Sequence, residues 1–152
     1  MSTAFETHPN EAVYTGTLDA AFSFETSNIG VDNPATLIRS DQDWGVHVQW
    51  TMSGSLVQNL DEEFRVTLYL EDLSPADKDV QLGPIPQRTN PTGSGGPTTE
   101  VYQLNIKAPA GTVPVGLYKP NVLIQMFDNP GTGAPWPVAC FAELPIINIY
   151  QV

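Results

Sequence analysis

The chain has 152 residues, with 17 acidic and six basic side chains that give a formal net charge of −11 at pH 7. This length is sufficient for one domain with a two-layer core. Nucleic acid and anionic membranes are disfavoured as partners, because the negative charge of the chain repels them.

Glycine and proline are frequent, with 12 and 14 copies, and the charged fraction of 15% is lower than disordered chains usually carry. This composition favours strands joined by many turns over long helices. We expect an extended N-terminal arm at residues 1–11 and a single β-sandwich domain at residues 12–152.

Residues 44–52 read W-G-V-H-V-Q-W-T-M and place an apolar side chain at every second position. This alternation is typical of a strand with one buried and one solvent-facing side, whereas a helix would scatter the same residues around its axis. Trp44 and Trp50 give the buried side a large apolar area. A second layer must therefore cover this strand.

Residues 64–70 alternate in the same way, with Phe64, Val66 and Leu68 on one side. We expect this strand to run antiparallel beside the strand at 44–52, because a link of about a dozen residues readily returns the chain to a neighbouring position.

Residues 12–18 and 21–26 favour a first strand or strand pair, and residues 35–39 favour a short strand. Three later segments also favour strands: residues 100–107, residues 118–127 with Pro120 at an edge or a bulge, and residues 138–150, the last one bent or broken at Pro145. Residues 83–97 read G-P-I-P-Q-R-T-N-P-T-G-S-G-G-P. We expect this segment to be a long exposed loop, because its glycines and prolines support neither a helix nor a sheet.

The sequence thus predicts seven to nine strands and no long helix, and the economical arrangement is an all-β sandwich of two antiparallel sheets. A closed barrel is the alternative architecture. The Trp50 strand, the strand at 64–70 and the Gly116-Leu117-Tyr118 entry to a late strand resemble immunoglobulin-like or fibronectin-like modules, over residues 35–150. This resemblance is to a fold and implies no catalytic residue, because such sandwiches host unrelated functions.

No residue pattern indicates catalysis, so we expect a protein that is not an enzyme and that needs no cofactor. His47 has no second ligand at a metal-binding spacing and no nucleophile motif beside it. Cys140, the single cysteine, lies in an apolar run that favours a buried, inert thiol. The N-terminus lacks the features of a secretory signal, so we expect a cytoplasmic protein, with export by another route left open.

Acidic residues provide one candidate binding site. If the strands at 44–52 and 64–70 are antiparallel, one end of the sandwich gathers five carboxylates: Asp41, Asp43, Asp72, Asp77 and Asp79. Converging carboxylate oxygens are the ligands that calcium prefers. Calcium binding is therefore one hypothesis, although the spacing is not that of an EF-hand.

Aromatic side chains provide a second candidate binding site, because carbohydrate-binding sandwiches stack sugar rings on exposed tryptophan and tyrosine. Trp44 and Trp50 are expected in the core, which leaves Trp136 and Tyr69 as candidates.

The favoured hypothesis is a structural or protein-interaction module that self-associates into a homo-oligomer. Strand edges and exchanged arms are common contacts between sandwich domains. We expect the contact elements to be residues 1–11, the loop at 83–97 and the tail at 146–152. The side chains predicted to contact a partner are Trp136, Tyr69, Ile147 and Ile149.

Overall fold

The computed structural model describes residues 2–4, 15–23, 36–54, 57–90, 99–128 and 134–151. Within these ranges the chain forms ten strands and one short 3-10 helix, η2 (Val57–Asn59). The strands are β1 (Ser2–Ala4), β2 (Thr15–Ser23), β3 (Leu37–Arg39), β4 (Trp44–Ser53), β5 (Glu63–Asp72), β6 (Val80–Arg88), β7 (Thr99–Ala108), β8 (Gly116–Phe127), β9 (Pro135–Glu143) and β10 (Ile147–Tyr150). The strands that sequence reasoning missed are β1, within the expected arm, and β6, within the expected loop.

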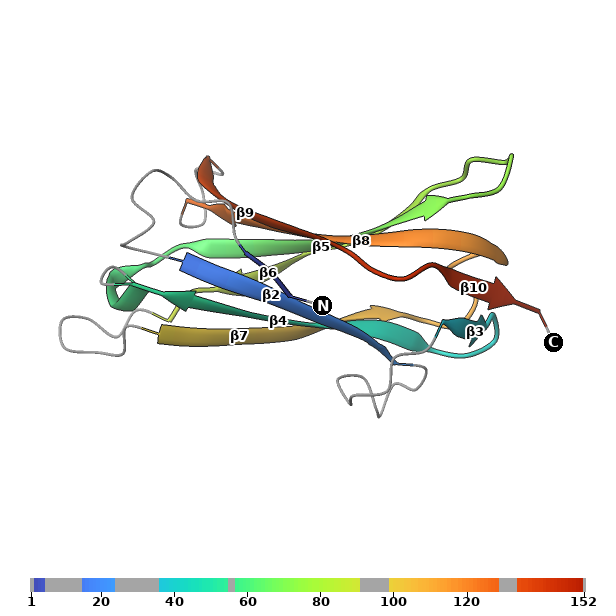
Figure 1. Ribbon diagram of the computed structural model, residues 1–152, viewed down its shortest axis with the longest axis horizontal. Helices are drawn as coiled ribbons and strands as arrows, with labels where there is room; N and C mark the ends of the chain where they lie inside the picture. Colours follow the sequence, from blue (N-terminus) through green and yellow to red (C-terminus); the bar gives the residue numbers. More distant parts are fainter. Residues whose placement is uncertain are drawn as a thin grey trace.

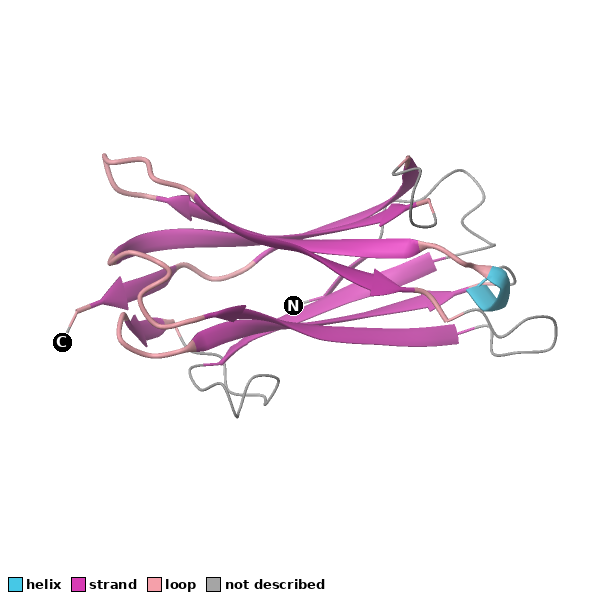
Figure 2. Cartoon of the chain, turned by 180° about the vertical axis from the view of Figure 1, so that it is seen from behind, coloured by secondary structure: helices cyan, strands magenta, loops and turns pink. Residues whose placement is uncertain are grey.

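The strands form two sheets that lie face to face (Figures 1 and 2). One sheet has the order β1-β2-β4-β7, and the other has the order β3-β10-β8-β5-β6 with β9 also paired to β8. All strand pairs are antiparallel except β3 and β10, which are parallel. The predicted all-β sandwich is confirmed.

Strand β4 crosses the four-stranded sheet between β2 and β7. Its five alternating apolar residues are buried: Trp44, Val46, Val48, Trp50 and Met52. Between them, His47, Gln49 and Thr51 are half-buried and face away from the second sheet. The period-2 pattern thus sets which side of this strand is covered, as the sequence predicts.

The expected pairing of β4 with β5 is wrong. Strand β5 lies in the other sheet, where it pairs with β6 and β8. The two strands with the strongest alternation therefore pack across the sandwich rather than along one sheet. The apolar side of each covers that of the other, and this arrangement removes both from water.

The expectation of an exposed loop at 83–97 is wrong for its first part, because β6 continues through Gly83 to Arg88. Residues 91–98 lie outside the described part of the chain. The prolines at 84 and 86 are compatible with a strand here because β6 is at the edge of its sheet, where one side of the backbone needs no partner. A β-bulge opposite Val66 and Leu68 inserts one extra residue into β6.

Pro120 was expected at an edge or a bulge, yet it lies within β8, a central strand. Two strands pair with the same edge of β8, one after the other. Strand β10 pairs with residues 116–118 of β8, and β9 pairs with residues 121–127. Pro120 falls at the gap between them, where its carbonyl accepts a hydrogen bond from the N–H of Leu144 at 3.0 Å. The missing N–H of proline is therefore tolerated, and the predicted break at Pro145 lies at the same gap.

The core is one continuous cluster between the sheets. Trp50, Leu68 and Ile124 belong to it, and Leu104 is half-buried against it, so the four segments predicted to share an interior do so. Cys140, the single cysteine of the chain, is buried in this cluster.

Gly83 offers a test of the β6 bulge. Its φ is +97°, and a Cβ at this position would lie 2.8 Å from the carbonyl oxygen of Val66. We expect Gly83→Ala to lower the free energy of unfolding by roughly 1–3 kcal/mol, measured by urea denaturation. Gly111→Ala is the matched control, since Gly111 also has a positive φ (+78°) but open space around its Cβ. Equal losses in the two variants would contradict the tight contact between β6 and β5.

Candidate functional site

The five aspartates predicted to bind calcium lie on two separate links. Asp41 and Asp43 lie between β3 and β4, whereas Asp72 ends β5, and Asp77 and Asp79 follow it. Within the described residues, no group of three or more His, Cys, Asp or Glu side chains is placed to hold a metal ion. The fold therefore does not assemble the predicted calcium set.

Local hydrogen bonds explain why the carboxylates of the second link do not converge. Asp72 accepts three hydrogen bonds at 2.9 Å, from the N–H and the hydroxyl of Ser74 and from the N–H of Lys78. Asp79 in turn accepts a hydrogen bond from the N–H of Asp72 at 2.9 Å. These carboxylates close the turn between β5 and β6. The hydrogen bonds from Lys78 and Ser74 lower the pKa of Asp72, because they stabilise its charged form.

The aspartates of the first link are also engaged locally. Asp41 pairs with Arg39, at 2.7 Å between Oδ2 and Nη2, and the hydrogen bond from this guanidinium lowers the pKa of Asp41. Asp43 accepts a hydrogen bond from the N–H of Ala110 at 2.8 Å, which ties the start of β4 to the turn after β7.

The structure corrects two of the four predicted partner contacts. Ile147 and Ile149 are fully buried, because β10 joins the six-stranded sheet and turns both side chains into the core. Tyr69 is exposed, as predicted. Trp136 lies in β9, and its side chain is outside the described part of the structure.

A different group of exposed apolar side chains gathers at one end of the six-stranded sheet. Among the described residues nine large apolar side chains are exposed, and six of them belong to this end. We call these six the apolar end patch: Leu37, Leu73, Val115, Leu117, Ile146 and Tyr150, each 39–58% exposed. Figure 1 shows β3, β10 and the C-terminus at the same end of the molecule.

Strand register brings members of the patch side by side. Leu37 on β3 and Leu117 on β8 both lie opposite Asn148 of β10, so the three residues form one row across the sheet. The N–H of Leu73 donates to the carbonyl of Leu117 at 3.0 Å and extends the row to the end of β5. Residues opposite each other in neighbouring strands point to the same face. This row therefore lies on the outer face, since Ile38 and Ile149 beside it are buried inward.

The same sheet neutralises much of its own charge. Four of the chain's six basic residues form ion pairs within or beside it: Arg39 with Asp41, Arg65 with Glu63, Arg88 with Asp61 and Lys119 with Glu143. Such exposed pairs contribute little to stability. They do, however, leave this face closer to neutral than the net charge of the whole chain would indicate.

A shallow groove lies beside Tyr69 on the outer side of β5 and β6. Its volume is about 230 Å³, and it is lined by Tyr69, Leu70, Glu71, Asp79, Val80 and Gln81. This volume is smaller than the range of about 300–1,000 Å³ that is usual for small-molecule pockets. The groove suits one ring of a ligand rather than a whole drug-sized molecule.

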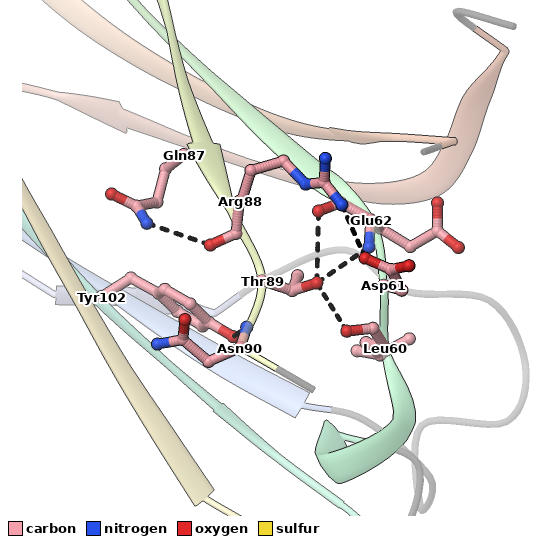
Figure 3. Close-up of polar contacts among 8 residues, drawn as sticks. All are labelled: Leu60, Asp61, Glu62, Gln87, Arg88, Thr89, Asn90 and Tyr102. Carbon is pink, nitrogen blue, oxygen red and sulfur yellow. Dashed lines mark hydrogen bonds and ion pairs between the residues drawn. The ribbon is translucent and has the colours of Figure 1, made fainter. Parts of the chain in front are cut away.

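A cluster of polar contacts at the far end of β6 serves the fold (Figure 3). The Thr89 hydroxyl donates to the carbonyl of Leu60 and accepts from the N–H of Glu62 at 2.8 Å. The N–H of Asn90 donates to the hydroxyl of Tyr102 at 3.4 Å. These contacts hold the chain as it leaves β6 for the other sheet, and burial raises the pKa of Tyr102.

His47, the one histidine on a described strand, lies on the outer face of the four-stranded sheet. Its Nδ1 is 2.8 Å from Oδ1 of Asn105, which lies directly opposite on β7. The contact fixes the ring against a neighbouring strand. In the described part of the chain, no helix has the length and apolar character required to cross a membrane.

Comparison with known proteins gives little beyond the fold. No family model matches the chain, and no curated protein matches it. Among solved structures the chain is similar to the "Putative ApaA Protein from Bordetella pertussis", with a TM-score of 0.42 and 10% sequence identity over 91% of this chain and 95% of that chain. A likeness this distant carries no argument about function.

The turn that Asp72 closes should make stability depend on pH. Because the pKa of Asp72 is lowered in the folded state, its contribution is present above the unfolded value of about 3.9 and is lost as the pH falls through the folded pKa. We expect Asp72→Asn to lower the melting temperature at pH 7. Below pH 4, the melting temperature of this variant should fall less steeply than that of the wild type. Asp77→Asn is the control in the same link, where asparagine tolerates the positive φ of +49°. Identical melting curves for the two variants between pH 7 and pH 3 would contradict the role of Asp72.

Proposed function

We propose that this chain is a non-catalytic, immunoglobulin-like β-sandwich module that works by self-association, with the cytoplasm as its expected location. The observation that carries this proposal is the apolar end patch, because six of the nine large apolar side chains that are exposed in the described part of the chain gather there. Exposed apolar side chains that are scattered singly need no explanation, whereas a contiguous group commonly marks a contact with another molecule.

The patch favours a contact between two copies of the chain. A row of side chains across a flat sheet can pack against the same row of a second copy related by a twofold axis, as is common in homodimers. Burying the patch would remove six apolar side chains from water. Three of them lie on paired strands (Leu37, Leu117 and Tyr150), and the other three lie directly beside a strand end.

The distribution of charge favours a contact between two copies through the six-stranded sheet over a contact through other surfaces. Two copies of a chain with a net charge of −11 repel each other at long range. A contact is least opposed where acidic groups are already paired with basic ones. The ion pairs of Arg39 and Lys119 lie on strands that also carry the patch, namely β3 and β8.

Leu117→Thr tests this contact. The substitution keeps a β-compatible side chain on β8 but removes apolar area near the centre of the patch in both copies. We expect the dissociation constant of the dimer to rise about tenfold or more, measured by size-exclusion chromatography with light scattering from low to high micromolar concentration. Added salt should strengthen association of the wild type, because it screens the repulsion between the copies.

Phe141→Thr is the matched control, because Phe141 is similarly exposed but lies on β9, outside the apolar end patch. A wild-type chain that elutes as a 16.5 kDa monomer at every concentration would refute self-association. An equal effect of both substitutions would show that the patch is not the contact.

The groove beside Tyr69 supports a second candidate function, the binding of a sugar ring. An exposed tyrosine ring can stack on the apolar face of a sugar while nearby carboxylates and amides bind its hydroxyls. The groove supplies all three groups, from Tyr69, Glu71 and Gln81. Its small volume points to one ring of a longer glycan.

Tyr69→Ala tests this second candidate. If the groove binds glycans, a glycan array should give signals with the wild-type chain that fall at least about fivefold in the variant, because the stacking surface is lost. Tyr150→Ala is the control, as Tyr150 has nearly the same exposure but lies outside the groove. An array without signals for the wild type would remove sugar binding and leave the proposed self-association unaffected.

A further inference from the structure

The edges of the two sheets are protected to different degrees. Natural sandwiches guard their edges with short strands, prolines, bulges or cover from neighbouring segments, because an open edge can pair with another chain. Strands β1 and β3 have three residues each, β6 carries two prolines and a bulge, and β9 carries two prolines and a register shift in its pairing with β8. Each of these edges is poorly suited to pairing with another chain.

Strand β7 lacks the short length, the prolines and the bulge of these edges, although β6 and η2 contact it. It has ten residues without a proline, and it pairs with β4 along its whole length without a register shift. Among the described strands, none pairs with its other edge. Within the described part of the chain it is therefore a long, regular edge that no other strand pairs with.

We propose that β7 pairs antiparallel with β7 of a second copy, so that the two four-stranded sheets become one continuous sheet. This inference rests on the proposed self-association but uses a surface on the other sheet, away from the apolar end patch. The contact is made mainly by backbone hydrogen bonds, and the alternating outer side chains decide which chain can approach.

The alternation of side chains between the two faces of a strand restricts which residues of the two β7 strands can lie opposite each other. Opposite residues of an antiparallel pair point to the same face, and the inner face of β7 must stay on the core. A register centred on Gln103 meets this condition and uses nearly the whole strand. It places Gln103 opposite Gln103 of the second copy, Val101 opposite Asn105, and Thr99 opposite Lys107.

Charge identifies a second copy as the partner. Between Glu100 and Lys107 the strand carries no charged residue, and the neighbouring outward residues of β4 are Gly45, His47, Gln49 and Thr51. In a chain with a net charge of −11, this edge and the adjoining face are thus nearly free of acids. In the register centred on Gln103, no acidic residue lies opposite another, so two copies meet without direct repulsion.

Disulfide crosslinking tests this pairing. Cysteines at position 103 would face each other across the twofold axis, at a Cα separation that suits a disulfide. The natural Cys140 is buried, so the unmodified chain provides the background. We expect Gln103→Cys to form a crosslinked dimer about tenfold or more faster than Gln49→Cys under mild oxidation of the full chain. Gln49 is the matched control because it lies directly beside Gln103 on β4, on the same face but away from the edge.

Combining these variants with Leu117→Thr separates this inference from the proposed function. Rapid crosslinking of Gln103→Cys that persists in the Leu117→Thr background would support pairing through β7. Equal rates for the two cysteine variants would overturn it, since they would indicate random collision or contact through the flat face. Slow crosslinking at both positions, while dimerisation still depends on Leu117, would overturn the β7 pairing alone. A chain that neither crosslinks nor dimerises would refute both proposals.

Discussion

The structure depends on a contact between aromatic side chains that joins the two sheets. Phe64 of β5 packs edge-on against Trp50 of β4 at 5.4 Å between ring centres, and Tyr102 of β7 stacks beside Trp50 at 5.6 Å. Phe64 and Tyr102 are also in contact, at 5.1 Å. Large aromatic groups contribute much of the apolar area that a small sandwich can bury. Because these rings come from both sheets, they fix the faces that meet and hence the faces left outside for other contacts.

The sequence predicted well which side of a strand is buried, but it predicted poorly which strands lie side by side. The alternation at residues 44–52 correctly gave the buried side of β4, because side-chain direction is a local property of a strand. The same alternation contains no information about which strand lies beside it, and so β5 was assigned to the wrong sheet. Strand β6 was missed because its prolines argue against a central strand, and its edge position, where prolines are tolerated, follows only from the complete topology.

The apolar end patch was harder to predict than the fold, because it depends on which strands lie side by side. Leu37 and Leu117 lie on β3 and β8, and Leu73 directly follows β5. Only the register of β3, β10, β8 and β5 places these three residues in one row. One signal was available: Leu117 stands between Gly116 and the inward Tyr118, so alternation alone puts it on the outer face. Ile147 and Ile149 were predicted to contact a partner because the break at Pro145 hides which of the residues after it face the core. The pairing of β10 with β8 determines this.

The strong negative charge of the chain limits where copies can meet. General repulsion between molecules keeps a protein with exposed apolar groups from associating indiscriminately. The two proposed contacts lie where charge opposes them least, at the ion-paired outer face of the six-stranded sheet and at the acid-poor edge of β7. A protein with two different self-contacts on opposite sheets can join its copies alternately through one and then the other. If both proposed contacts form, the length of such an assembly would depend on concentration and ionic strength.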